Sequence, residues 1–257
     1  MEPAGLAVGL ISLATTFDSV LNCFEYVHLG KNFGTDFEDC LLKLDNARLR
    51  LSRWGEAVGL SEVEEDTTSL KGTKISEADI PQAQKLLGGV LTQLKRVKTL
   101  EAEFKRGKAP NDASLAEVSM KTDVGSVALS LHEKMRKMAK RRQNNLSTRK
   151  KAKWALYDRR HFNDMIDSIA NKTKELQELF PAAVPTERTL VDKETLELSE
   201  SLVLLQNVIK EQDQALASAL NAILKPVAEK VNNTVHGGNV GVMSAHRSDI
   251  RQSFGSS

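Results

Sequence analysis

Residues 3–24 form a nearly uncharged stretch, and no other part of the sequence restricts the possible folds as strongly. The only formally charged side chain in it is that of Asp18. A helix of this length, with a rise of 1.5 Å per residue, extends about 33 Å, comparable with the roughly 30 Å of hydrocarbon in a bilayer. Gly5 and Gly9 have the G-x-x-x-G spacing, which lets another helix approach closely. The stretch therefore predicts either the buried central helix of a bundle or a self-associating membrane span.

Polar residues in the second half of this stretch argue against a permanent membrane anchor, because a charged side chain at the bilayer centre costs about 2.5–3.5 kcal/mol. A signal peptide is not expected, since Glu2 stands where a positive charge is usual. We predict a helix that is buried at rest and inserts conditionally. The residues expected to enter the membrane are Gly5, Leu6, Val8, Gly9, Leu10, Ile11, Leu13 and Phe17. Exposing large apolar side chains costs about 1.5–3 kcal/mol each, so those expected to be buried at rest are Leu6, Leu10, Leu13, Phe17 and Leu21.

The rest of the chain predicts an all-α, multi-helix bundle, because apolar residues recur with helical period and aromatic residues make up only 5% of the sequence. The sequence offers few segments from which a β-sheet could form. The first helix is expected to end near Leu29, and the acidic segment 59–82 to be a connection with at most one helical turn. Further helices are expected over 37–58, 80–106, 123–157 (as one helix or two), 159–180 and 187–224 (as one long helix or a pair).

Three local expectations accompany these helices. The helix 37–58 should be amphipathic, with Lys43, Arg48, Arg50 and Arg53 on the face opposite the core. Gly88-Gly89 should weaken its helix or let another helix pack closely, and Pro181 and Pro185 should end the helix before them.

The last part of the chain changes in character. We divide the sequence into a helical domain, 1–225, and a tail, 226–257, rich in Asn, Gly and Ser. The tail has too few large apolar residues to offset its ordering entropy, so it is expected to be poorly ordered alone but capable of β pairing. The residues expected to stack are Val235, Gly237, Gly238, Val240 and Val242.

No catalytic, metal or cofactor signature was found. The five histidines are scattered, without metal-ligand spacing, and no nucleophile elbow or phosphate-binding loop occurs. Cys23 and Cys40 are expected to be reduced and buried. The protein is therefore not expected to be an enzyme.

A basic run lies between Lys134 and Lys153, with ten Lys or Arg residues and no Asp or Glu. It could be a solvated face, or it could bind anionic lipid, where each basic residue contributes about 1 kcal/mol. Nucleic acid is less favoured because the run lacks stacking aromatics. The candidate lipid-binding residues are Lys134, Arg136, Lys137, Lys140, Arg141, Arg142, Arg149, Lys150 and Lys151.

Three stretches of the sequence resemble parts of a known protein family. They are "LNCFEYVHLGKNFGTDFEDCLLKLDNARLRLSRWGEAV", the preceding "EPAGLAVGLISLATTF" and the later "KKAKWALYDRRHFNDMIDSIA". In this order they resemble the fungal HeLo domain of heterokaryon-incompatibility proteins of the HET-S/HET-s type, over most of residues 1–225. The resemblance implies a cytoplasmic helical domain, dimeric at rest, whose first helix is held until a C-terminal prion segment forms a β-solenoid. The helix would then enter the membrane as part of a larger, pore-forming oligomer.

Two departures from the family leave alternatives open. The tail is too short for the two pseudo-repeats of the family archetype, so it is a single amyloid motif, another signalling tail or a vestige. Asn22 and Asn32 stand where family members with and without killing activity differ, and they match neither type. The alternative function is a non-lytic interaction module or inhibitor that dimerises and binds amyloid-bearing partners.

Overall fold

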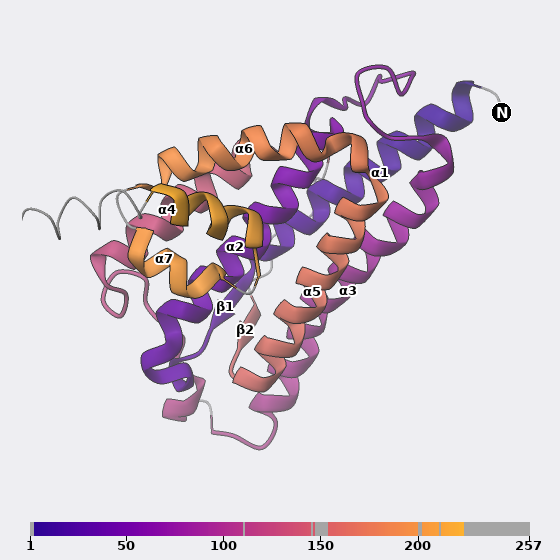
Figure 1. Ribbon diagram of the computed structural model, residues 1–257. Coiled ribbons are helices and arrows are strands. Elements are labelled where there is room, and N and C mark those ends of the chain that lie inside the picture. The colour runs from indigo at the N-terminus through magenta and orange to yellow at the C-terminus, as the bar shows by residue number, and fades with distance from the viewer. Residues whose placement is uncertain are drawn as a thin grey trace, which may run out of the picture.

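A computed structural model describes residues 3–109, 111–144, 146, 154–199, 202–210 and 212–223 (Figure 1). These residues form helices joined by turns and by longer connections, with one pair of very short strands, so the predicted all-α class is confirmed. The connection after α2 contains two short 3-10 turns, Leu60–Glu62 and Glu77–Asp79, where at most one helical turn was predicted. The α-helices are α1 (Pro3–Phe24), α2 (Phe37–Val58), α3 (Ile80–Lys105), α4 (Ser126–Arg141), α5 (Arg159–Leu179), α6 (Val184–Glu197), α7 (Leu202–Ile209) and a further helix at 214–223. The two domains predicted from the sequence stay a prediction, since the tail lies outside the described residues.

Helix α2 is the centre of the bundle and packs against α1, α4, α5, α6 and α7. Acidic residues in its first turn complement the helix dipole, and Gly59, with φ of 90°, ends it in the left-handed conformation that glycine adopts without strain. The prediction of a solvent-facing basic side was wrong for Arg48 and Arg53, which are buried. Glu25, which follows α1, pairs with Arg48, and Glu194 and Asp213 from the C-terminal part pair with Arg53. No pattern within 37–58 could reveal these partners.

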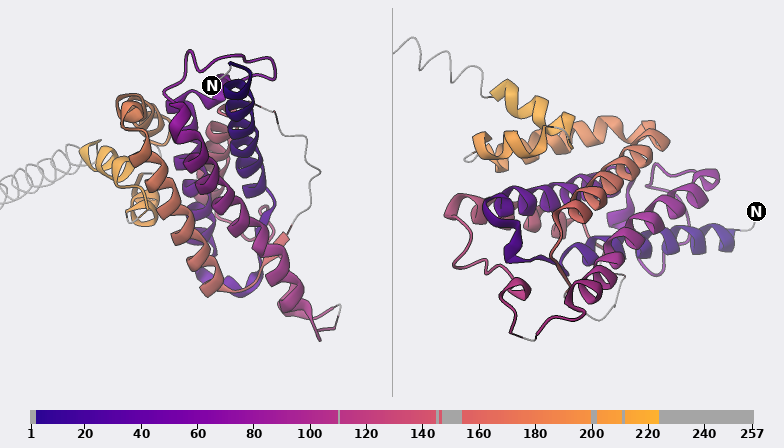
Figure 2. Two further views of the ribbon diagram at one scale, coloured as in Figure 1. Left: turned by 90° about the vertical axis from the view of Figure 1, so that its right-hand side faces the viewer. Right: turned by 90° about the horizontal axis from the view of Figure 1, so that it is seen from below.

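Helices α3 and α5 lie side by side along most of their length (Figures 1 and 2). Their apolar stripes follow the predicted spacing, with Leu87, Val90 and Leu94 of α3 and Phe162 and Ile169 of α5 buried in the same core. At Gly89 a Cβ atom would lie 2.6 Å from Cε of Lys172, which is near the flexible end of that side chain and can move aside. Both alternatives for the Gly88-Gly89 pair therefore stay predictions.

The first helix ends five residues before the predicted Leu29, and a parallel pair of strands was missed. Strand β1 (Val27–Leu29) pairs with β2 (Trp154–Leu156) in the register Val27 with Trp154 and Leu29 with Leu156. The predicted helical pattern over 123–157 was therefore too long: α4 stops at Arg141, and Trp154 lies in a strand. Three-residue strands that pair across the chain leave no periodic signal in either segment.

The C-terminal part divides more finely than predicted. Pro181 follows the end of α5, but Pro185 lies in the first turn of α6, where its missing N–H is not needed. The expected helix or pair over 187–224 consists of α6, α7 and the helix 214–223 among the described residues. They form a second apolar cluster with Leu49 of α2 and Leu131 of α4. Cys23 and Cys40 are free and buried, as predicted.

Candidate functional site

Helix α1 has one buried face and one partly exposed face. Leu10, Leu13, Phe17 and Leu21 are fully buried, which confirms their predicted burial at rest. On the other side Val8 is 67% exposed. Gly5 and Leu6 lie in the helix, but their side chains are outside what the structure describes. One described helix window, Ala7–Phe24, is long and apolar enough to cross a membrane, and 56% of it is buried, as in a core helix of a soluble protein.

Close contacts seat α1 on α2 and α3. The Phe17 ring lies over Gly55 of α2, where a Cβ atom would come within 2.1 Å of it, and it meets Trp54 edge-on at a centroid distance of 6.1 Å. Near the N-terminal end, a Cβ at Gly9 would lie 3.6 Å from Ile80 of α3. The most extensive contacts of α1 are with α3, α2 and the short turn Leu60–Glu62, and α1 lies at one edge of the helical body (Figure 2).

Polar side chains join the C-terminal half of α1 to the end of α4. Asp18 is fully buried and accepts a hydrogen bond of 3.2 Å from Asn22. Asn22 in turn accepts one of 3.3 Å from Gln143, which lies just beyond α4. The polar residues that make a permanent membrane anchor unfavourable therefore have polar neighbours in this fold.

Directly after α1, Glu25 lies between two arginines. Its carboxylate is 3.0 Å from Arg48 of α2 and 3.5 Å from Arg136 of α4. Burial acts to raise the pKa of Glu25, but the attractions of Arg48, Arg136 and Lys140 together outweigh burial and the pKa is lowered. Glu25 is thus held as a carboxylate at the joint between α1 and β1.

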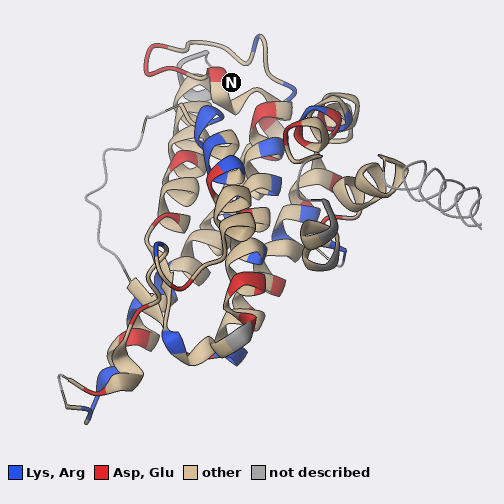
Figure 3. Ribbon diagram, turned by 90° about the vertical axis from the view of Figure 1, so that its left-hand side faces the viewer, with Lys and Arg blue, Asp and Glu red and all other residues tan. Residues whose placement is uncertain are grey.

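The described part of the basic run lies on α4 and its C-terminal end. Arg136, Lys137, Lys140 and Arg141 are exposed, and Lys134 is half-buried. Arg141 is 2.8 Å from Glu197 of α6. Both basic and acidic segments occur on the side of the molecule that Figure 3 faces. Arg149, Lys150 and Lys151 lie outside the described residues, as do all the predicted stacking residues of the tail, Val235, Gly237, Gly238, Val240 and Val242.

Arg142 does not belong to the exposed basic residues, contrary to its place in the predicted lipid-binding set. It is buried, 2.6 Å from Glu194 of α6 and 2.5 Å from Glu56 of α2. Carboxylates distant in sequence neutralise it, so in this conformation its guanidinium does not face a lipid headgroup.

The buried charges around α2 form what we call the Arg53 cluster: Arg53, Arg142, Glu194 and Asp213. Arg53 is 2.6 Å from Glu194 and 2.7 Å from Asp213, and all three are at most 2% exposed. Burial acts to raise the pKa of Asp213, but Arg53, together with Arg50 and the hydrogen bond from Leu216 N–H, outweighs burial and the pKa is lowered. The cluster fastens α6 and the start of the helix 214–223 to α2. Sequence reasoning missed it, since its members come from four separate segments.

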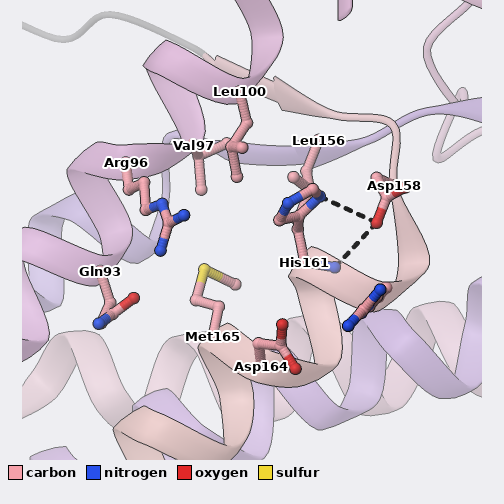
Figure 4. A pocket seen from close by; sticks show the side chains of 10 residues that line it. Gln93, Arg96, Val97, Leu100, Leu156, Asp158, His161, Asp164 and Met165 are labelled. Carbon is pink, nitrogen blue, oxygen red and sulfur yellow. Dashed lines mark hydrogen bonds and ion pairs between the residues drawn. The ribbon is translucent and has the colours of Figure 1, made fainter. Parts of the chain in front are cut away.

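A cleft lined by both polar and apolar side chains lies between α3 and α5, and Figure 4 shows its lining. Val97 and Met165 form apolar walls, and Arg96 reaches into the hollow from α3 (Figure 4). The His161 ring points toward Asp158, and its Nδ1 lies 3.0 Å from Oδ1 of Asp158. None of the ten lining residues is a serine, threonine or cysteine, so the histidine–carboxylate pair has no hydroxyl or thiol nucleophile to activate in this cleft. Among the described residues no group of three or more His, Cys, Asp or Glu could hold a metal ion.

Comparisons with known proteins agree on one family. Residues 5–208 match the HeLo family, described as "Prion-inhibition and propagation". Heterokaryon incompatibility protein s of Podospora anserina is 31% identical over 219 residues, covering 85% of this chain and 73% of that protein. Heterokaryon incompatibility protein S of the same species is 29% identical over 260 residues, covering 97% and 88%.

Solved structures give the same picture for the fold. The HET-S N-terminal domain is similar with a TM-score of 0.74 at 28% identity, covering 88% of this chain and 100% of that one. A doubly substituted HET-s N-terminal domain is similar with a TM-score of 0.73 at 29% identity, covering 83% and 98%.

Proposed function

This chain belongs to the HeLo family, and from that premise we propose that it is a membrane-targeting, pore-forming cell-death effector of fungal heterokaryon incompatibility. Membership in this family implies a role in heterokaryon incompatibility. The finer proposal is that the protein rests in the cytoplasm as a dimer. On activation α1 leaves the bundle, enters the membrane and joins a larger oligomer.

The observation that carries this proposal is the position of α1. It has the length of a membrane span, yet it lies at one edge of the body, and most of its packing is with α3 and α2, with smaller contacts to one short turn and a hydrogen bond from Gln143 beyond α4. The Arg53 cluster and the second apolar cluster hold α2, α4, α6 and α7 together without any residue of α1. Departure of α1 would therefore leave much of the bundle connected, at the cost of exposing the core surface that Phe17 and its neighbours cover.

The exposed basic residues of α4 are proposed to contact anionic lipid. Lys137 and Lys140 are exposed and three residues apart on one helix. Replacing both with glutamate should weaken binding to anionic vesicles more than about 30-fold, since each lysine removed costs about 1 kcal/mol near an anionic surface. Vesicle co-sedimentation at low salt, repeated at high salt, measures this.

The matched control is a second exposed lysine pair with the same spacing, Lys95 and Lys98 of α3. Lys95→Glu with Lys98→Glu makes the same change in net charge at another place, so binding should fall much less. Circular dichroism checks that both variants stay folded. Equal loss in the two variants would mean that net charge, and not the α4 face, governs binding.

The tail is proposed to receive the activating signal from an amyloid-templating partner. If its residues stack as β-strands, Val240→Pro should prevent seeded fibre formation, because proline removes a ladder donor and is excluded from central strands. Fibre growth of the full chain is followed by thioflavin fluorescence, with Ser248→Pro, outside the proposed stacking residues, as the control. Undiminished seeding of the Val240→Pro chain would remove these residues from the switch.

Dye release from anionic-lipid vesicles tests the proposed activity as a whole. We expect release by the full chain once its tail is seeded, and little release without seeding. If seeded protein binds vesicles but never releases dye, the non-lytic interaction module becomes the better account of this family member.

A further inference from the structure

An apolar groove runs between α6 and the helix 214–223. Its walls are Val184 and Val191 on one side and Ala215 and Ala219 on the other, and its volume is about 400 Å³. Val184 is 37% exposed, although it is a large apolar residue. The charged residues along the groove are Glu187, Arg188 and Asp192, with a net charge of −1. The groove thus offers apolar contact with an acidic bias.

Glu187 distinguishes this groove from an ordinary surface depression. It is 8% exposed, and its Oε2 accepts a hydrogen bond from Gln177. Its Oε1 is buried and accepts no hydrogen bond from the described residues. Burial raises the pKa of Glu187, and the hydrogen bond from Gln177 offsets this only in part. A buried carboxylate oxygen without a donor costs free energy. Because this oxygen has less than 1 Å² of exposed area, a cation in the groove would stabilise the carboxylate through its charge and not through a direct hydrogen bond.

We propose that this groove binds residues 225–231 of the same chain. The helix 214–223 forms one wall, and the chain continues from its end with 34 residues (257 − 223) outside the description. From Ile223 back to Ala215 is eight helical residues, about 12 Å. The eight residues 224–231 can span about 26 Å when extended, so the chain can turn and run back along the groove.

The sequence of this segment fits the groove. Pro226 cannot continue a helix and disfavours helical conformation at Lys225, which favours a change of chain direction before Val227. Val227 and Val231 provide apolar side chains for the walls. Lys225 and Lys230 provide cations for Glu187 and Asp192, and with Glu229 the segment has a net charge of +1 against −1 in the groove. A second copy docking through its own helix 214–223 fits less well, because that helix has no lysine or arginine to pair with Glu187.

Docking would keep the beginning of the tail against α6 until a partner pulls it away. This role in regulation rests on the proposed function, but the docking itself does not. Whether residues 225–231 occupy the groove can be measured in the resting chain, with no membrane and no seed present.

Cysteine cross-linking in the full chain tests the docking. Ala219→Cys with Val231→Cys places one thiol in the groove and one in the proposed occupant. Leu196→Cys with Val231→Cys is the control, since Leu196 is 71% exposed on α6 but does not line the groove. The native Cys23 and Cys40 are buried and should not compete. Under mild oxidation the groove pair should form an intrachain disulfide about tenfold faster or more, because docking raises the effective concentration of the thiols.

Two outcomes would overturn the proposal. Equal rates for the groove pair and the control pair would show that the tail has no preference for the groove. Disulfides formed mainly between two chains would assign the groove to a second copy. Reversing both lysines, Lys225→Glu with Lys230→Glu, should slow the groove pair toward the control rate, and an unchanged rate would contradict the charge pairing. A rapid intrachain disulfide in a protein that never releases dye from vesicles would uphold docking while the pore-forming function fails.

Discussion

Replacing Arg53 with alanine should lower the free energy of unfolding by about 3–5 kcal/mol, the typical cost of removing one partner from a buried charge cluster. Arg53 is 1% exposed and lies 2.6 Å from Glu194 and 2.7 Å from Asp213. Without it, Glu194 keeps Arg142 as a cation, but Asp213 loses the arginine that holds its pKa down. A buried carboxylate then stays unpaired, or it takes up a proton at a cost in stability.

Urea unfolding followed by circular dichroism measures this change. The matched control is Arg159→Ala, because Arg159 also pairs with an aspartate, Asp36, but both side chains are about half exposed, at 56% and 41%. Exposed pairs contribute only about 0–1 kcal/mol, so this variant should unfold close to wild type. Similar small losses in both variants would mean that the Arg53 cluster does not hold the C-terminal helices to α2.

The contrast between buried Arg53 and exposed Arg159 also shows which parts of the fold could be predicted from the sequence. Helices α2, α3 and α5 were predicted to within a residue or two at each end, because each carries a sustained apolar stripe with turn or proline signals beside it. The stripe identifies the buried face of a helix only when the other face meets water. Arg53 lies on the polar face of α2, and its burial depends on Glu194 and Asp213, far along the chain.

The same limit applies to the candidate site, where the burial of apolar side chains could be predicted and the burial of charged ones could not. Burial of Leu10, Leu13 and Phe17 could be predicted, since large apolar side chains need a core in any folded state. Which arginines of the basic run stay exposed could not, because Arg141 and Arg142 are neighbours in sequence and only one of them faces the interior. The strands β1 and β2 were missed for want of any local pattern, although they fix the chain just after α1.

The strongest test of α1 release is a disulfide that fastens it to α3. A Cβ at Gly9 would lie 3.6 Å from Ile80 Cγ2, and Cγ2 is bonded directly to the Ile80 Cβ. Ile80 Cβ itself lies more than 4 Å from that position, so the two Cβ atoms are near the upper end of the separation of about 3.5–4.5 Å that a disulfide requires. Gly9→Cys with Ile80→Cys should form the bond in the resting protein, with Cys23 and Cys40 buried and unreactive.

Oxidised Gly9→Cys/Ile80→Cys protein should release no more dye from anionic vesicles than vesicles alone, even with its tail seeded, because a pinned α1 cannot span the bilayer. Reductant should restore release to the level of the reduced protein. The single variants Gly9→Cys and Ile80→Cys, treated with the same oxidant, control for the substitutions and for oxidation, and they should leak throughout. Equal leakage before and after reduction would show that α1 need not leave α3 for the protein to release dye. The disulfide holds the apolar helix in the bundle but leaves the basic residues of α4 able to bind lipid, so it blocks the release of α1 alone.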